Sequence, residues 1–433
     1  MRTPRTIFAL SLGLLTVGAI LFSRAAPEPA LSGSVGSLAI ATAALPGAEP
    51  TDREIARLQE RVRTSPDSRA ALERLGWTLV GKARETGDAG YYRLAEHAAL
   101  ALRDSDPLAS TLLRGHVLHA LHRFDEAERL ARQLVGERGL AFDHGLLGDV
   151  LLDRGDVEGA IGAYQRMLDQ RPDAHAQVRA SRVRHLRGDV EGALEALRDA
   201  AQAVGIRSRE SYAWIQSELA LREFEAGDFS AALADLQAAL EIVPSFPRAL
   251  ALEGRILLAE GRAADAVTPL REAAARTPFP DVLWTLVDAL EAAGRSSEAR
   301  ATQARLLASG ERVDPRGFAL FLASRGLEPE RAVGLARREL ERRRDVYSFD
   351  ALAWSELAAG DTAAARGHIR RALAEGTHDA RLFLHAGVIA ARSGAPAKAS
   401  DWLTRARALE HTLLPSERAL LDRQLASPSA EQS

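Results

Sequence analysis

Hydrophobic and polar positions alternate along this chain with the period of a helix, in runs of about 14 residues separated by short turns. Residues 141–174, AFDHGLLGDVLLDRGDVEGAIGAYQRMLDQRPDA, contain two such runs on either side of Gly155. Glycine takes the left-handed conformation that often ends a helix, and the aspartate after it, Asp156, can accept the unpaired N–H groups of the next helix. The pattern predicts two short helices joined by a tight turn and closed by Pro172, since proline cannot continue a helix.

The same unit recurs down the chain. A turn glycine returns at intervals of 32 to 39 residues, at Gly155, Gly188, Gly227, Gly261, Gly294, Gly326, Gly360 and Gly394. Small residues also recur 12 positions apart, one on each helix of the unit, as in Gly148 with Ala160, Ala220 with Ala232, and Gly254 with Ala266. Small side chains there let the two helices approach closely. A fixed period of this size predicts a solenoid of stacked helix pairs, in which each unit contacts its neighbours.

A 34-residue unit with Leu147-Gly148, then Ala160, then an aromatic residue or leucine such as Tyr164, and a closing Pro172 resembles the tetratricopeptide repeat. The resemblance covers residues 69–413. It implies an all-α fold, a right-handed superhelix of about ten repeats. The pattern weakens at Gln303, over 313–345 and near 203–211, where we expect local irregularity.

The first residues differ from everything that follows. Arg2 and Arg5 precede an apolar run, Ile7–Phe22, and small residues follow at Ser23 and Ala25, the positions that a signal peptidase reads. This run is shorter than the roughly 20 residues that span a bilayer, so the pattern favours an export signal, with an uncleaved membrane anchor as the alternative. The predicted divisions are 1–25 signal peptide or anchor, 26–50 flexible linker, 51–68 N-terminal capping helix, 69–413 repeat array, 414–426 C-terminal capping helix and 427–433 disordered tail.

This N-terminal pattern predicts a protein outside the bacterial cytoplasm. We expect it in the periplasm or secreted, or alternatively anchored in the inner membrane and facing the periplasm. The chain has 56 basic and 59 acidic residues, a balance that gives no general attraction to nucleic acid. It has no cysteine, and therefore no disulfide and no lipid-modified N-terminal cysteine. No zinc-hydrolase motif, nucleophile elbow or glycine-rich phosphate loop occurs. We therefore expect neither an enzyme nor a cofactor nor a small-molecule substrate.

Histidines near the end of one helix form a candidate metal site. His116 and His119 lie three positions apart, on adjacent faces of the predicted helix, and could form a metal pair. His122 occupies the slot of the turn glycine, and histidine is enriched in left-handed conformations. No Cys, Asp or Glu lies nearby with ligand spacing, so metal binding stays a lesser alternative and we assign no metal ligands.

The repeat resemblance also predicts where partners bind. In tetratricopeptide arrays the first helix of each pair lines a concave groove, and the repeat phase places twelve residues on or near that face: Trp77, His116, His119, Asp149, Asp153, Arg182, Trp214, Phe224, Arg255, Trp284, Tyr347 and Trp354. Aromatic side chains are favoured anchors because they bury a large area at little entropic cost. The alternative is that these aromatics pack against the neighbouring repeat.

The resulting prediction is an exported scaffold or adaptor that holds a peptide or helix of a protein partner in its groove. Apolar groups of the partner would pack on Trp214, Phe224, Trp284 and Trp354, and aspartates and arginines would set its orientation. A second hypothesis is a regulatory or assembly subunit of a cell-envelope complex, which binds through the convex face or through the basic helix around Arg337–Arg344.

Overall fold

The computed structural model describes residues 34–65 and 69–426. Within these residues the chain forms 23 α-helices and one 3-10 turn, and no strand. The predicted signal at 1–25 and tail at 427–433 lie outside the described residues. The first twelve helices are α1 Ser34–Ala41, α2 Pro50–Thr64, α3 Arg69–Thr86, α4 Gly90–Leu102, α5 Pro107–Ala120, α6 Phe124–Glu137, α7 Ala141–Asp153, α8 Val157–Gln170, α9 Ala174–Leu186, α10 Val190–Ala203, α11 Arg209–Glu225 and α12 Phe229–Ile242.

Eleven further helices and the 3-10 turn η1 complete the fold. They are α13 Pro247–Ala259, α14 Ala263–Arg276, α15 Pro280–Ala292, α16 Ser296–Val313, α17 Pro315–Ser324, α18 Pro329–Arg342, α19 Val346–Ala358, α20 Thr362–Ala372, α21 Ala380–Arg392, α22 Pro396–Ala408, η1 Glu410–Thr412 and α23 Pro415–Ala426. Helices α3 to α22 pack as ten successive pairs, each odd-numbered helix against the even-numbered helix that follows it. The prediction of an all-α solenoid is confirmed.

The turn chemistry inside the pairs matches the sequence pattern. All eight glycines of the series have positive φ, between 64° and 87°, and His122 has φ 58°. Asp156 accepts the Gly159 N–H at 2.9 Å and thereby caps α8. The small residues are required where expected, because a Cβ atom on Gly148 would lie 2.3 Å from the Tyr164 ring. Ala160 is fully buried at the same seam.

The N-terminal segment is more ordered than predicted. Residues 34–41 fall inside the expected linker 26–50, yet they form α1, which packs on α4. Ser37 and Ala41 are buried there, and the Gln59 side chain of α2 donates to the carbonyl oxygens of Ala41 and Ala43 at 3.2 and 2.7 Å. The expectation of a linker over 34–41 is corrected, since small and apolar side chains in this stretch cover the first repeat.

The irregular joints lie where the repeat pattern weakens. Helix α16 has 18 residues and α17 only 10, and Glu328, before α18, has a left-handed φ of 41°. No helix of the described residues is long and apolar enough to cross a membrane.

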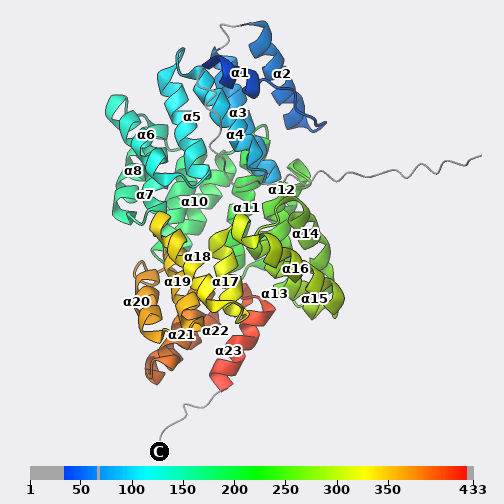
Figure 1. The fold of residues 1–433 in the computed structure, drawn as a ribbon, viewed down its shortest axis with the longest axis vertical. Coiled ribbons are helices and arrows are strands. Elements are labelled where there is room, and N and C mark those ends of the chain that lie inside the picture. Colours follow the sequence, from blue (N-terminus) through cyan, green and yellow to red (C-terminus); the bar gives the residue numbers. More distant parts are fainter. Residues whose placement is uncertain (1–33, 66–68, 427–433) are drawn as a thin grey trace, which may run out of the picture.

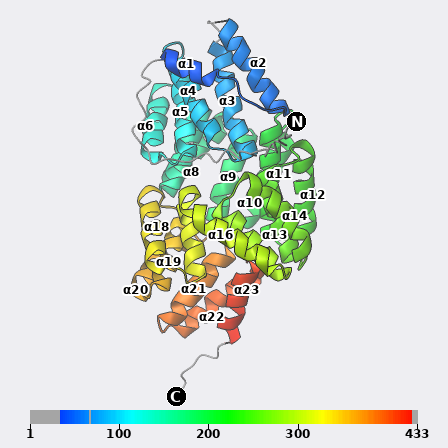
Figure 2. The ribbon, with the colours of Figure 1, turned by 45° about the vertical axis from the view of Figure 1, so that its right-hand side comes forward.

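The superhelix closes on itself after one turn. Helices α18 and α19 come back next to the region of α7–α9, as Figures 1 and 2 show (yellow against cyan and green). The Arg344 N–H, in the loop after α18, donates to the Asp153 carbonyl at the end of α7 at 3.0 Å. Thr377 Oγ1, in the loop after α20, donates to the Leu186 carbonyl at the end of α9 at 2.8 Å. The C-terminal ends of α7 and α9 therefore meet the loops after α18 and α20. One full turn of the superhelix contains the six helix pairs from α7 to α18.

Candidate functional site

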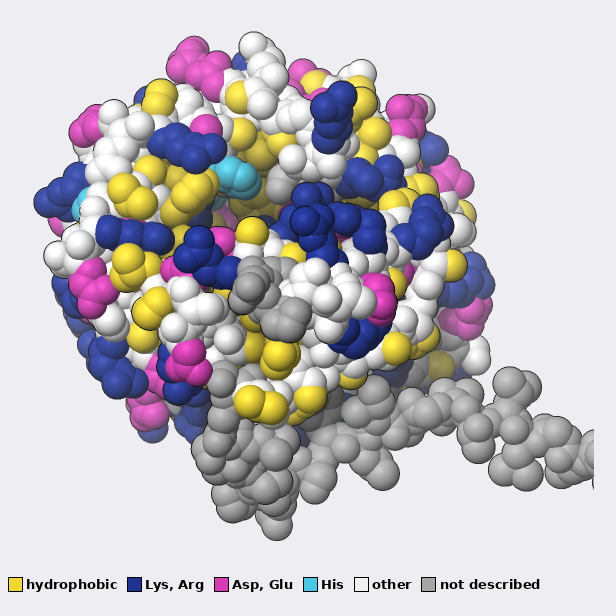
Figure 3. All heavy atoms as spheres, turned by 90° about the horizontal axis from the view of Figure 1, so that it is seen from above, with side chains coloured by type: hydrophobic (Ala, Val, Ile, Leu, Met, Phe, Trp, Pro, Cys, Tyr) yellow, Lys and Arg dark blue, Asp and Glu magenta, His cyan; other side chains and the backbone are white. Residues whose placement is uncertain are grey.

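The closed turn surrounds a central cavity of about 1030 Å³. One part of its wall comes from α3, α5, α7, α9 and α11, the first helices of five consecutive pairs. The opposite part comes from the loop after α18, from α19 and from the loop after α20. Seen from above, the molecule is hollowed near its centre, with basic side chains and a histidine around the hollow (Figure 3).

Arginine dominates the charge of this cavity. The lining contains ten arginines and five carboxylates: Arg84, Arg154, Arg179, Arg182, Arg222, Arg248, Arg316, Arg343, Arg344 and Arg371 against Asp149, Asp156, Glu218, Asp345 and Glu375. The whole chain has a net charge of −3. The lining itself therefore holds more arginines than carboxylates. Three carboxylates outside the lining, Asp153, Glu210 and Glu225, pair with four of these arginines.

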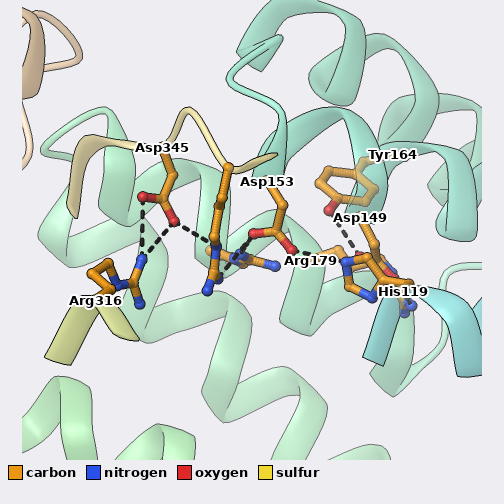
Figure 4. Close-up of polar contacts among 9 residues, drawn as sticks. His119, Asp149, Asp153, Tyr164, Arg179, Arg316 and Asp345 are labelled. Atoms are coloured by element: carbon orange, nitrogen blue, oxygen red, sulfur yellow. Dashed lines mark hydrogen bonds and ion pairs between the residues drawn. The ribbon is translucent and has the colours of Figure 1, made fainter. Parts of the chain in front are cut away.

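Asp149 of α7 anchors one end of a polar network along the wall (Figure 4). It accepts a hydrogen bond from the Tyr164 hydroxyl at 2.9 Å and two from Arg179, at 2.9 and 2.6 Å. Burial opposes ionisation of Asp149, but the Arg179 guanidinium outweighs it and lowers the pKa of this carboxyl to about 2. Asp149 is therefore a carboxylate across the physiological pH range.

Asp153, one helical turn further along α7, holds the ring closed. Its carboxylate lies 2.8 Å from His119 Nε2 of α5 and 2.8 Å from Arg182 Nη2 of α9. It also accepts from Arg343 Nη2 of the returning loop at 3.1 Å, across 190 residues of sequence. Burial opposes its ionisation, and Arg182, the hydrogen bond with His119 and Arg343 still hold the pKa of Asp153 well below its usual value.

The network continues through the returning loop. Arg343 Nε lies 2.9 Å from Asp345, and Arg316 Nη1 lies 3.0 Å from the same carboxylate. Figure 4 shows these groups as one row, from Tyr164 at one end to Arg316 at the other. The paired side chains hold the wall of the cavity in place. Only charged groups outside these pairs are free to bind a partner.

Two arginines of the lining have no carboxylate partner among the described residues. Arg344 uses its backbone N–H in the closure, and its side chain forms no ion pair. The Arg371 guanidinium lies 4.7 Å from the centre of the Phe349 ring and forms no ion pair either. Arg182 is paired with Asp153 but keeps 42% of its side chain exposed. These guanidinium groups have unused donors toward the cavity.

Two histidines of the cavity, His116 and His185, are neutral at pH 7. Burial lowers the pKa of His116 to about 3. Burial and the Arg222 guanidinium lower the pKa of His185 to about 3. Among the described residues, no group of three or more His, Asp and Glu side chains could hold a metal ion. His116 packs edge-on against Trp77, with ring centres 5.3 Å apart.

Part of the predicted groove therefore meets in one place. Six of its residues line the cavity: His116, His119, Asp149, Arg182, Trp214 and Tyr347. Asp153 pairs with them from behind, and Trp77 is partly buried beside His116. Whether these residues bind a partner stays a prediction.

The other four predicted residues lie elsewhere and are covered. Phe224, Trp284 and Trp354 are 1%, 2% and 7% exposed, and they pack between helices. The Arg255 Nη2 donates to the Thr412 carbonyl at 3.0 Å. The chain's own C-terminal segment lies over that part of the inner face, so Phe224, Trp284 and Trp354 present no open face in this structure. Their role in partner binding stays a prediction.

Sequence reasoning missed most of the arginines. Arg179 was within reach, because it lies three positions before Arg182 on the same first helix. The sequence placed Arg343 and Arg344 only in the basic helix around Arg337–Arg344, and only the closure of the superhelix brings them to the cavity.

Away from the cavity, α11 and α12 bring two carboxyls together. Burial and the neighbouring Asp235 carboxyl raise the pKa of Glu223 to about 7. Glu223 is 5% exposed.

Comparison with known proteins agrees with the repeat pattern. The family described as "Tetratricopeptide repeat" matches residues 146–205, 217–281 and 351–410. Among solved structures, a thermophilic TPR protein of Thermus thermophilus is 19% identical and aligns over 41% of this chain and 92% of its own, with a TM-score of 0.35. The human IFIT1 dimer with PPP-AAAA is 16% identical over 74% of this chain and 77% of its own, with a TM-score of 0.47. MamA is 20% identical over 37% of this chain and 93% of its own, with a TM-score of 0.30. No curated protein matches the chain.

Proposed function

Because this chain belongs to the tetratricopeptide repeat superfamily, we propose that it is a protein-interaction scaffold that takes a short acidic segment of a protein partner into the central cavity. One observation carries the proposal: ten arginines and only five carboxylates line this cavity in a protein of slightly negative net charge, and two of the arginines, Arg344 and Arg371, have no carboxylate partner within the described residues. Charges of opposite sign on the partner would complement this excess and would steer its approach.

The dimensions of the cavity support a segment and not a folded domain. Its volume of about 1030 Å³ lies at the upper end of the range for ligand pockets, ~300–1,000 Å³. Apolar side chains such as Val178, Trp214 and Val346 share the wall with the arginines. An occupant that alternates carboxylates with apolar side chains fits both kinds of surface.

The free guanidinium groups give a clean test. A random peptide library displayed on phage is selected on the immobilised full chain, and the selected peptides are then measured by fluorescence anisotropy. We expect enrichment in Asp and Glu. The double variant Arg344→Ala, Arg371→Ala removes two charges without breaking an ion pair, and it should weaken binding by about tenfold or more.

A matched control removes two arginines from the outside of the same region. Arg337 and Arg338 of α18 have 63% and 61% of their side chains exposed. The variant Arg337→Ala, Arg338→Ala should bind the selected peptides as the wild type does. Selected peptides of neutral or basic composition, or equal binding by the cavity variant, would refute the cavity as the site.

We further propose that the chain is exported. Arg2 and Arg5, the apolar run Ile7–Phe22 and the small residues Ser23 and Ala25 support this. The intact mass of protein recovered from the periplasm of an expressing bacterium tests it. A mass that lacks residues 1–25 indicates cleavage, whereas retention of the full chain in the cytoplasm contradicts export.

A further inference from the structure

The C-terminal segment 409–426, which contains η1 and α23, lies on the inner face of the superhelix. Helix α23 packs against α15 and α21 as well as α22, and η1 contacts α11 and α13. Figures 1 and 2 show α23 (red) beside α13. The chain thus fills part of its own predicted groove.

Polar contacts hold this segment at successive helices of the wall. His411 Nε2 lies 2.9 Å from the carbonyl oxygen of Phe224, and the Thr412 carbonyl accepts from Arg255. The Ser416 N–H, in the first turn of α23, donates to Asp288 of α15 at 2.9 Å. Two of these contacts use backbone groups of the segment, at Thr412 and Ser416, which any helix with the same entry could supply. The third uses the His411 side chain.

One side chain supplies the specific anchor. The Glu417 carboxylate is 5% exposed and lies 2.5 Å from Arg381 Nε and 3.2 Å from Arg381 Nη2, on α21. Burial opposes its ionisation, and Arg381 still lowers the pKa of Glu417 below its usual value. A fork of two charge-assisted contacts of this kind selects a planar carboxylate.

The apolar grip of α23 is incomplete. Leu421 is fully buried, but Leu425 is 39% exposed. A hollow of about 290 Å³ remains between α23 and the wall, lined by Trp284, Trp354 and Leu420 among others. The indole N–H of Trp284, a residue 2% exposed, has no hydrogen-bond partner within the described residues. Helix α23 therefore does not fill the groove, and it offers no hydrogen-bond acceptor to the Trp284 indole N–H.

We propose that this groove is a docking site for an amphipathic helix of a partner protein, and that α23 is a resident occupant which the partner helix replaces. The partner helix carries a carboxylate at the position of Glu417 and a larger apolar residue than Leu420. It also presents a hydrogen-bond acceptor to Trp284. Helix α23 follows the last of the ten pairs and belongs to none of them. The proposal does not depend on the acidic segment of the central cavity.

The experiment uses the full chain and a fluorescein-labelled synthetic peptide of residues 409–426. In the wild type, the tethered α23 competes with the peptide, and we expect weak binding. The chain variant Glu417→Ala loosens α23 and should bind the peptide at least about tenfold more tightly. The chain variant Arg381→Ala loosens α23 equally but removes the anchor for Glu417 of the peptide, and it should bind no better than the wild type. Circular dichroism checks that both variants are folded.

Further measurements separate the alternatives. A peptide with Leu420→Phe should bind the Glu417→Ala chain several-fold more tightly than the unmodified peptide, because the larger ring fills the hollow. Hydrogen exchange at the amides of α23 should accelerate when peptide binds. The variant Arg344→Ala, Arg371→Ala should bind this peptide as the wild type does, which separates the groove from the cavity.

Three results would overturn the proposal. Equal peptide binding by the Glu417→Ala and Arg381→Ala chains would place the peptide outside the Arg381 site. Peptide binding with unchanged exchange in α23 would show that nothing is displaced. Dimerisation of the Glu417→Ala chain in light scattering would assign the groove to α23 of a second copy and not to a partner.

Discussion

Replacement of Asp153 by asparagine tests the closure of the superhelix with almost no change in side-chain volume. Asp153 is 4% exposed and receives His119, Arg182 and Arg343 from three different elements. An asparagine amide offers one acceptor oxygen where the carboxylate offers two, and its NH₂ group then faces donors.

The expected loss is set by burial. Removal of one partner from a buried ion pair costs about 3–5 kcal/mol. Arg182 keeps 42% of its side chain exposed and Arg343 keeps 17%, so water takes over part of their solvation. We therefore expect about 2–3 kcal/mol of lost closure free energy.

Hydrogen exchange measured by mass spectrometry locates this loss. The Arg344 N–H donates to the Asp153 carbonyl across the closure, so amides of the loop 343–345 should exchange faster in the variant, while those of α21 and α22 stay protected. The matched control is Asp125→Asn, which removes an ion pair with Arg154. The Asp125 side chain is 86% exposed, so this substitution should cost less than about 1 kcal/mol. Unchanged exchange at 343–345, or equal effects of the two substitutions, would refute the assignment of Asp153 as the closing residue.

Three further predictions concern stability. Gly155→Ala and Gly227→Ala both place alanine at positive φ, but only a Cβ at Gly155 meets the Arg344 carbonyl oxygen, at 2.5 Å. Gly155→Ala should therefore lower the free energy of unfolding in urea by about 1–3 kcal/mol more than Gly227→Ala. Equal losses would contradict the close approach. Ala266→Trp, at a fully buried seam, should destabilise by ~1–3 kcal/mol or more, and an unchanged melting curve would show that the helix register is wrong. Burial and a neighbouring carboxyl raise the pKa of Glu223 from 4.5 to about 7. The stability that neutral Glu223 provides is therefore complete below pH 4.5 and is lost as the pH rises through about 7. The melting temperature should fall between about pH 5 and pH 8, and it should fall less in Glu223→Gln.

The helix pairs could be predicted because their determinants are local. The turn glycine, the capping aspartate and the small residues at each seam act within one unit, and their spacing is visible in the sequence. Gly155, Asp156 and Gly148 all adopt the roles that their positions indicate. Helix α1 was missed because eight residues of small and apolar character show no period; its order comes from packing on α4.

The residues of the candidate site also fall into those that local pattern predicts and those that it does not. His119, Asp149 and Arg182 lie on first helices, so the repeat phase alone directs them inward. Arg344 and Arg371 lie on a loop and a second helix, where the phase gives no direction. Their place at the cavity depends on the angle accumulated over six pairs, including the long α16 and the short α17, and no local pattern encodes that sum.

The contact between Asp153 and Arg343 also limits how the chain can evolve in length. An open array can gain or lose a unit by duplication or deletion, because each repeat meets only its neighbours. In this chain, one extra unit between α9 and α17 would carry Arg343 past Asp153 by a whole helix pair, and Thr377 would miss Leu186 in the same way. Changes in repeat number are compatible with the ring only outside that stretch, so the number of repeats between the two halves of the closure is part of the site itself.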